Sequence, residues 1–122
     1  MRLSTEEIAD FLSQVNGFRS IDVDELTQIA EKMEVRTFKT GDMVIRKGDA
    51  GDNMHVIYHG RVRVLLTDSA GNSKMVVHLS ARDLVGEMAL LTGDKRNADV
   101  VAEEDMTTLV MHRKVLQPLL RE

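Results

Sequence analysis

One stretch of the sequence gathers residue types that could hold a small anionic ligand. Glu87 to Leu91 favours about one turn of helix, with Gly86 before it and Arg96 shortly after it. The free backbone N–H groups at a helix start favour an anion, and the guanidinium of Arg96 could swing back over that end. The carboxylate of Glu87 would repel a phosphate, so we expect it to accept a hydrogen bond from a hydroxyl.

These features predict a pocket for one phosphate and one neighbouring hydroxyl, the pair of groups that a nucleotide presents. The small side chains of Ala89 and Ala98 would let a ligand approach the backbone closely. Spacing alone leaves a second interpretation open, in which the segment is a surface helix whose Glu87 and Arg96 are solvated charges.

Other constellations that could do chemistry are incomplete. The four histidines lack the spacing of a metal-binding cupin, and there is no cysteine. Asp49, Asp52 and Asn53 hint at a calcium loop, but Gly51 is out of register and no Glu closes it, so a solvated turn is predicted. No nucleophile elbow is present. The prediction is a domain without catalysis and without a metal.

Composition indicates one ordinary soluble domain. The 122 residues are 43% hydrophobic and 30% charged, with a net charge of −4. No cluster of Lys and Arg would follow a phosphate backbone, so direct nucleic-acid binding is not expected. The sequence has neither a signal-peptide pattern nor an apolar run long enough to span a membrane. We therefore expect a cytoplasmic location without membrane insertion.

The elements around this stretch follow from periodicity. Ser4–Val15 reads as an amphipathic helix in which Ser4 and Glu7 have capping-box spacing, and a second helix starts after Asp22. From Val35 onward the pattern changes to short β-rich runs separated by turns, and a last helix starts near Lys114. This order predicts an α+β fold, an antiparallel β-roll or jelly-roll barrel with N-terminal helices, a short middle helix and the start of a C-terminal helix.

Residues 85–100 resemble the phosphate-binding cassette of the cyclic-nucleotide-binding domain family. That pattern runs Phe-Gly-Glu-x-Ala-Leu-x, a variable loop, then Arg-x-Ala-x-Val. Residues 38–49 look like the opening strands of the family, and residues 56–64 look like its central hairpin. The resemblance covers nearly the whole chain and implies one domain over residues 1–122, with helices in 1–34, the roll in 35–113 and a helix start in 114–122.

The resemblance implies a role for each matching residue. Glu87 would accept from the ribose 2′-hydroxyl, and Arg96 would pair with an oxygen of the cyclic phosphate. Without ligand, we expect the guanidinium of Arg96 to reach solvent. The remaining ligand-binding residues would line phosphate and ribose or supply apolar surface for ribose and base: Gly86, Met88, Ala89, Asn97 and Ala98, together with Val64 and Val76 on the roll.

Several positions depart from the family pattern. Val85 replaces the usual aromatic residue, Arg82 replaces a common glycine, and Lys95 stands where proline is frequent. Asn97 leaves the choice between cAMP and cGMP open, because its amide could bond either base or neither. Asp99 would oppose a phosphate if it faced the pocket and would be harmless if it faced away.

The function implied by the resemblance is regulatory. The domain would bind cAMP or cGMP and transmit its occupancy, through the helix after the roll, to an attached or partner effector whose identity the sequence does not give. Two alternatives remain: a scaffold or interaction domain of the same fold that binds no nucleotide, and the sensor half of a truncated transcription regulator.

Overall fold

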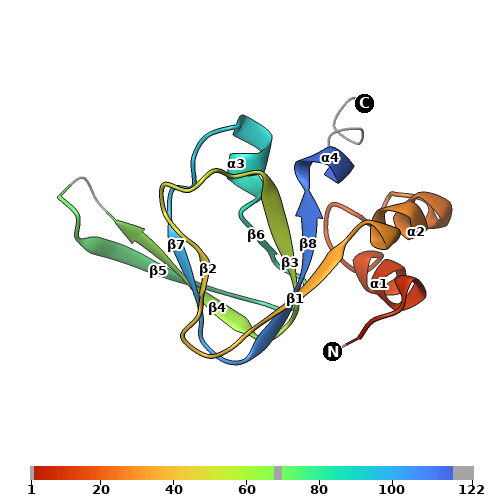
Figure 1. The fold of residues 1–122 in the computed structure, drawn as a ribbon, viewed down its shortest axis with the longest axis horizontal. Helices are drawn as coiled ribbons and strands as arrows, with labels where there is room; N and C mark the ends of the chain where they lie inside the picture. The colour runs from red at the N-terminus through yellow and green to blue at the C-terminus, as the bar shows by residue number, and fades with distance from the viewer. Residues whose placement is uncertain (1, 68–69, 117–122) are drawn as a thin grey trace.

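Two antiparallel sheets form the body of the computed structural model, with helices at both ends of the chain (Figure 1). Residues 2–67 and 70–116 are described, with the backbone alone at 67, 73–75, 88 and 116. The helices are α1 (Thr5–Leu12), α2 (Val23–Glu31), α3 (Glu87–Thr92) and α4 (Arg113–Leu116); the strands are β1 (Glu34–Phe38), β2 (Met43–Ile45), β3 (Asn53–His59), β4 (Arg61–Thr67), β5 (Ser73–Ser80), β6 (Leu84–Val85), β7 (Asp99–Ala102) and β8 (Met106–His112).

The strand order is β1-β8-β3-β6 in one sheet and β2-β7-β4-β5 in the other. This confirms the predicted α+β roll, although the strands remain two four-stranded sheets and do not close into a barrel. The C-terminal helix starts at Arg113, one residue before the predicted start. The rest of that prediction, residues 117–122, lies outside the described residues.

The N-terminal helices begin where their capping residues predict. The Ser4 hydroxyl accepts from the Glu7 backbone N–H at 3.1 Å, and the Glu7 carboxylate accepts from the Ser4 N–H at 3.0 Å. At the start of α2, the Asp22 carboxylate accepts from the Asp24 N–H at 2.7 Å. These contacts satisfy backbone donors that have no partner inside a helix, and so fix where each helix starts.

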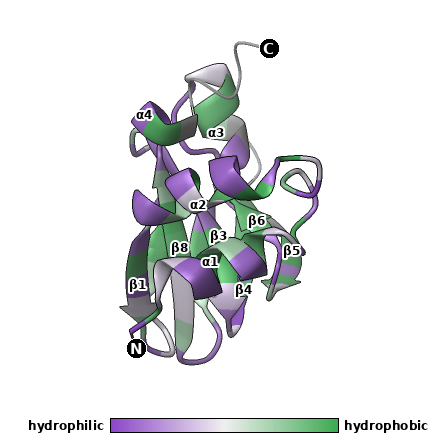
Figure 2. Ribbon diagram, turned by 90° about the vertical axis from the view of Figure 1, so that its right-hand side faces the viewer, coloured by the Kyte–Doolittle hydropathy of each residue, from purple (hydrophilic) through white to green (hydrophobic). Residues whose placement is uncertain are grey.

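The first sheet separates two apolar cores. Val56 of β3 packs with the N-terminal helices, whereas Ile57 packs between the two sheets, because successive strand residues point to opposite faces. Figure 2 shows hydrophilic residues on parts of α1 and α2, with the more hydrophobic strands β3, β6 and β8 behind them. Leu90 of α3 joins the core under the N-terminal helices, so the middle helix and those helices share one packed cluster.

None of the helices in the described part of the chain has both the length and the apolar character needed to cross a membrane.

Candidate functional site

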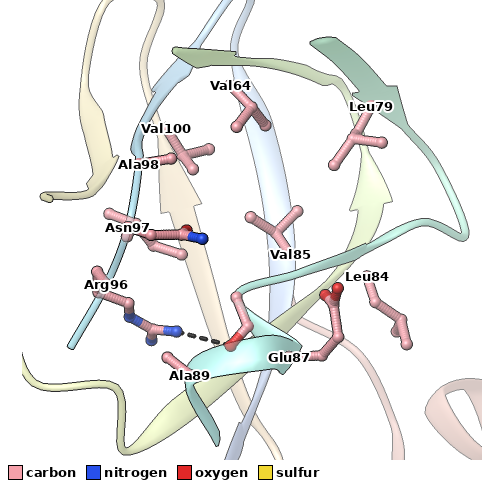
Figure 3. Close-up of a pocket in the computed structure, with 12 residues that line it drawn as sticks. Val64, Leu79, Leu84, Val85, Glu87, Ala89, Arg96, Asn97, Ala98 and Val100 are labelled. Atoms are coloured by element: carbon pink, nitrogen blue, oxygen red, sulfur yellow. Dashed lines mark hydrogen bonds between the residues drawn. The ribbon is translucent and has the colours of Figure 1, made fainter. Parts of the chain in front are cut away.

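A pocket opens between the second sheet and the segment that contains α3 (Figure 3). It combines one carboxylate and one guanidinium with a mainly apolar wall. Its lining residues are Ile45, Val64, Leu79, Leu84, Val85, Gly86, Glu87, Ala89, Arg96, Asn97, Ala98 and Val100.

Arg96 is buried, with 7% of its surface exposed. Its Nη1 donates to the Gly86 carbonyl at 2.7 Å, and its Nη2 donates to the backbone carbonyl and the side-chain oxygen of Asn53 at 2.7 and 2.8 Å. The expectation that the guanidinium reaches solvent is therefore wrong. The loop before β3 folds over it, and the Arg96 backbone pairs with that loop through Gly48 and Asp49 at 2.8 Å each.

The electrostatics of Arg96 combine two opposing effects. Burial lowers the pKa of its guanidinium, because a charged group loses hydration, whereas the nearby carboxylates of Asp52, Asp49 and Glu87 act in the opposite direction. A guanidinium remains protonated at neutral pH despite such a shift. The pocket therefore has a buried positive charge in its wall, and the guanidinium that carries it donates to the oxygens of Gly86 and Asn53.

Glu87 lies at the first position of α3, directly after Gly86, whose carbonyl accepts from Arg96. Its Oε2 is buried and has no hydrogen-bond partner among the described residues. A buried polar atom without a partner costs free energy, so it requires an explanation such as a ligand or an ordered water. A carboxylate oxygen can only accept, so the missing partner is a donor such as a hydroxyl.

Gly86 allows the close approach of these two groups. Its φ is +84°, in the left-handed region, and a Cβ built on it would clash with Arg96 Nη1 and lie 2.9 Å from Ile45 Cδ1. Only glycine combines this backbone conformation with the space that the guanidinium occupies.

Most of the predicted site residues do meet in this pocket. Gly86, Glu87, Ala89, Arg96, Asn97, Ala98 and Val64 all line it. The side chain of Met88 lies outside the described residues.

Val76 does not lie with the others. It pairs with Leu65, whereas Val64 pairs with Val77, so Val76 points away from the face that carries Val64. Val76 is 47% exposed, and Leu79 supplies the β5 wall of the pocket. The prediction for Val76 fails because the register of β5 against β4 decides which alternate residues face inward.

Two further polar residues, Asp99 and Asn53, make hydrogen bonds near the pocket. Asp99 Oδ1 accepts from the Lys47 backbone N–H at 2.8 Å, so this carboxylate is engaged by the loop that follows β2. Asn53, predicted to lie in a solvated turn, instead starts β3 and holds Arg96. The sequence does not indicate this role for the Asn53 side chain, because its partner Arg96 lies 43 residues away.

In the described part of the chain, no three His, Cys, Asp or Glu side chains gather closely enough to hold a metal ion.

Comparison with known proteins agrees with this geometry. The family described as "Cyclic nucleotide-binding domain" matches residues 35–122. The chain is 32% identical over 111 residues to cGMP-dependent protein kinase 2 of Mus musculus, spanning 89% of this chain and 15% of the kinase. It is 35% identical over 96 residues to the cAMP-dependent protein kinase regulatory subunit of Dictyostelium discoideum, spanning 76% of this chain and 29% of that protein.

A solved structure shows the same fold. The regulatory subunit of a cAMP-independent protein kinase A from Trypanosoma brucei superposes with a TM-score of 0.87 at 31% identity, covering 95% of this chain and 44% of that one. The chain thus spans a minor part of the relatives that it matches. Family match, fold and pocket together show that this chain belongs to the cyclic nucleotide-binding domain family, whose domain is regulatory and not catalytic.

Proposed function

We propose that the pocket binds cAMP or cGMP, with Arg96 on the cyclic phosphate and Glu87 on the ribose 2′-hydroxyl. The observation that carries this proposal is the buried Glu87 Oε2, which finds no donor within the described part of the chain and belongs to the same pocket lining as a buried guanidinium. A ribose hydroxyl supplies that donor, and the neighbouring cyclic phosphate supplies the anion that a guanidinium binds strongly.

The rest of the pocket suits the remaining parts of a nucleotide. Val64, Leu79 and Val85 offer apolar surface to the ribose and base. Asn97 is exposed at the pocket and can meet ligand atoms at its opening. The Ala89 and Ala98 side chains are short enough for the ligand to approach the backbone, as the family's cassette requires.

The occupied pocket would act on α4 through the loop before β3. The Arg113 backbone N–H donates to the Asp52 carbonyl at 2.9 Å, and its Nη2 donates to the Gly51 carbonyl at 3.1 Å. Asn53, the next residue along, holds Arg96. A phosphate that draws on Arg96 therefore changes the partners of a loop on which α4 begins, which gives occupancy a route to an effector.

The proposal extends to the role of the chain as a whole. Residues 1–122 form one regulatory unit in the cytoplasm that catalyses no reaction, inserts in no membrane and binds no nucleic acid directly. The effector is an attached domain or a partner protein.

Calorimetric titration of the 122-residue chain with cAMP, cGMP and AMP tests the proposal. We expect saturable binding of at least one cyclic nucleotide in the micromolar range, about −8 kcal/mol, and weaker binding of AMP. Equal and negligible heats for all three ligands would reject the proposal and support the scaffold alternative.

A further inference from the structure

Arg82 has an unusual backbone conformation. Its φ is +78°, and within residues 2–67 and 70–116 it alone among the non-glycine residues has a positive φ. The left-handed region brings the Cβ of an L-residue close to its own carbonyl, so glycine is favoured there. The turn is held in place all the same, because the Arg82 N–H donates to the Ile57 carbonyl at 2.8 Å. A strained residue that persists calls for a role of its side chain.

That side chain reaches the N-terminal helices. Arg82 Nη2 donates to the Gln14 side-chain oxygen at 3.0 Å, across 68 residues of sequence. Its guanidinium carbon lies 5.8 Å from the centre of the Phe11 ring, within the range of a cation–π contact. The Phe11 ring in turn lies 4.8 Å from the Tyr58 ring of β3. Glycine at position 82 would remove the strain and both contacts of the Arg82 side chain, with Gln14 and with Phe11.

The turn that carries Arg82 leads directly into the pocket. Asp83 follows it, then β6, then Gly86 and Glu87. Leu84 of β6 both lines the pocket and packs against the core under α1 and α2. Leu84 therefore belongs to the same packed core as α1 and α2, and the Arg82 side chain contacts Phe11 and Gln14 from the turn just before it.

We propose that Arg82 is a positioning residue for the pocket, tying the end of α1 to the turn before β6 so that docking of the N-terminal helices and placement of Glu87 are coupled. This inference rests on the proposed function, since it assigns to Glu87 the ribose hydroxyl. Release of α1 loosens the turn and β6, and this weakens the hydrogen bond that Glu87 accepts from the ribose hydroxyl. By reciprocity, a ligand held by Glu87 favours the docked position of α1.

Four variants separate positioning from stability. Arg82→Ala and Arg82→Gly both remove the side chain, but only the alanine retains the cost of the left-handed backbone. Gln14→Leu removes the acceptor, and Arg82→Lys retains a cation and a donor. For each we would measure the free energy of unfolding in urea and the affinities for cAMP and cGMP and for their 2′-deoxy analogues. Amide hydrogen exchange of residues 84–90 would be measured without ligand.

The ratio of ribose to 2′-deoxy affinity is the decisive readout, because the analogue cannot use Glu87. Arg82→Ala, Arg82→Gly and Gln14→Leu should each lower this ratio about two- to fivefold, the range of an exposed cation–π contact or hydrogen bond. The combined Arg82→Ala and Gln14→Leu variant should lose no more than Arg82→Ala alone, because Gln14 acts only through Arg82, and Arg82→Lys should recover part of the ratio. Exchange of residues 84–90 should speed up by a similar factor.

Two outcomes would overturn the inference. One is an unchanged affinity ratio in Arg82→Ala. The other is a ratio that follows stability, so that Arg82→Gly, the more stable of the pair, differs from Arg82→Ala. If the parent bound neither nucleotide, the proposed function would be rejected. Amide hydrogen exchange would still test whether Arg82 holds the turn before β6. Equally accelerated exchange in Arg82→Ala and Arg82→Gly would support this role of Arg82, and exchange rates equal to those of the parent would reject it.

Discussion

The guanidinium of Arg96 donates twice to Asn53, to its backbone carbonyl at 2.7 Å and to its side-chain oxygen at 2.8 Å. The phosphate-binding arginine proposed here is thus already held in place without ligand. A phosphate that binds Arg96 would therefore share the guanidinium with these two oxygens or displace them. The same contacts give Arg96 a structural role as well as a binding role.

Arg96→Leu is expected to weaken both binding and folding. Removing a buried charge partner typically costs about 2–5 kcal/mol, so cyclic-nucleotide affinity should fall by tens to thousands of fold. The free energy of unfolding should fall by about 2–3 kcal/mol, because the carbonyls of Gly86 and Asn53 lose a charged donor. Calorimetry and urea denaturation measure the two effects.

If Arg96→Leu does not fold, Arg96→Lys tests the phosphate role in its place. This variant should have only part of the parent's affinity, since an ammonium cannot form the bidentate fork. Lys95→Ala is the matched control. Its side chain is exposed, so stability should change by about 0.5 kcal/mol or less. A folded Arg96→Leu variant that binds like the parent would remove the phosphate role.

Glu87→Gln is expected to separate binding from stability. Because Oε2 lacks a hydrogen-bond partner in the described residues, its replacement breaks no such bond, and the free energy of unfolding should stay within about 1 kcal/mol of the parent. Affinity for the ribose nucleotide should fall, and the 2′-deoxy analogue should bind poorly to the parent. The two losses should not add. Additive losses would place the action of Glu87 elsewhere.

Gly86→Ala should impair the pocket through geometry. The added Cβ would clash with Arg96 Nη1, and the left-handed φ of +84° disfavours any Cβ. We expect a loss of about 1–3 kcal/mol in unfolding free energy, with reduced nucleotide affinity. Gly93→Ala is the control: its φ is also positive, at +79°, but a Cβ there meets nothing within 4 Å. Equal binding losses in both variants would argue against the predicted clash.

His55 should make stability depend on mildly acidic pH. Burial, reinforced by the charges of Arg36 and Arg96, lowers the pKa of this ring to about 4, from 6.5. Between these values the unfolded chain binds the proton more readily, so the free energy of unfolding falls as pH drops through the window. A shift of this size corresponds to up to about 3 kcal/mol.

Urea denaturation across that window tests the prediction, with His55→Gln as the comparison. The glutamine retains a polar group toward Thr108, whose hydroxyl lies 2.9 Å from His55 Nδ1, but does not titrate. Its pH dependence should be flatter than that of the parent. Glu34, whose pKa of about 2 is lowered mainly by Arg36, loses its own stabilising effect as pH falls below about 4.5, and it does so in parent and variant alike. Parallel curves for parent and variant would contradict the assignment.

The local parts of this protein follow from its sequence. Ser4 and Glu7 lie within one turn of each other, so their spacing alone predicts the helix start. Gly86, Glu87 and Arg96 lie in one short segment, and the resemblance of that segment to the family's cassette predicts a pocket with a carboxylate and a guanidinium. Such features depend on contacts between neighbours in sequence, which pattern and propensity encode directly.

Only the tertiary structure decided the rest. The burial of Arg96 depends on Asn53, a residue 43 positions away, and the outward direction of Val76 depends on how β5 pairs with β4. In the sequence, Arg82 only replaces a glycine that is common in the family, and its contact with Gln14 is visible only in the structure. In each case, two segments distant in sequence meet in a way that periodicity within either segment cannot determine. For Val76 the deciding factor is strand register, because a shift of one residue reverses every side chain of a strand.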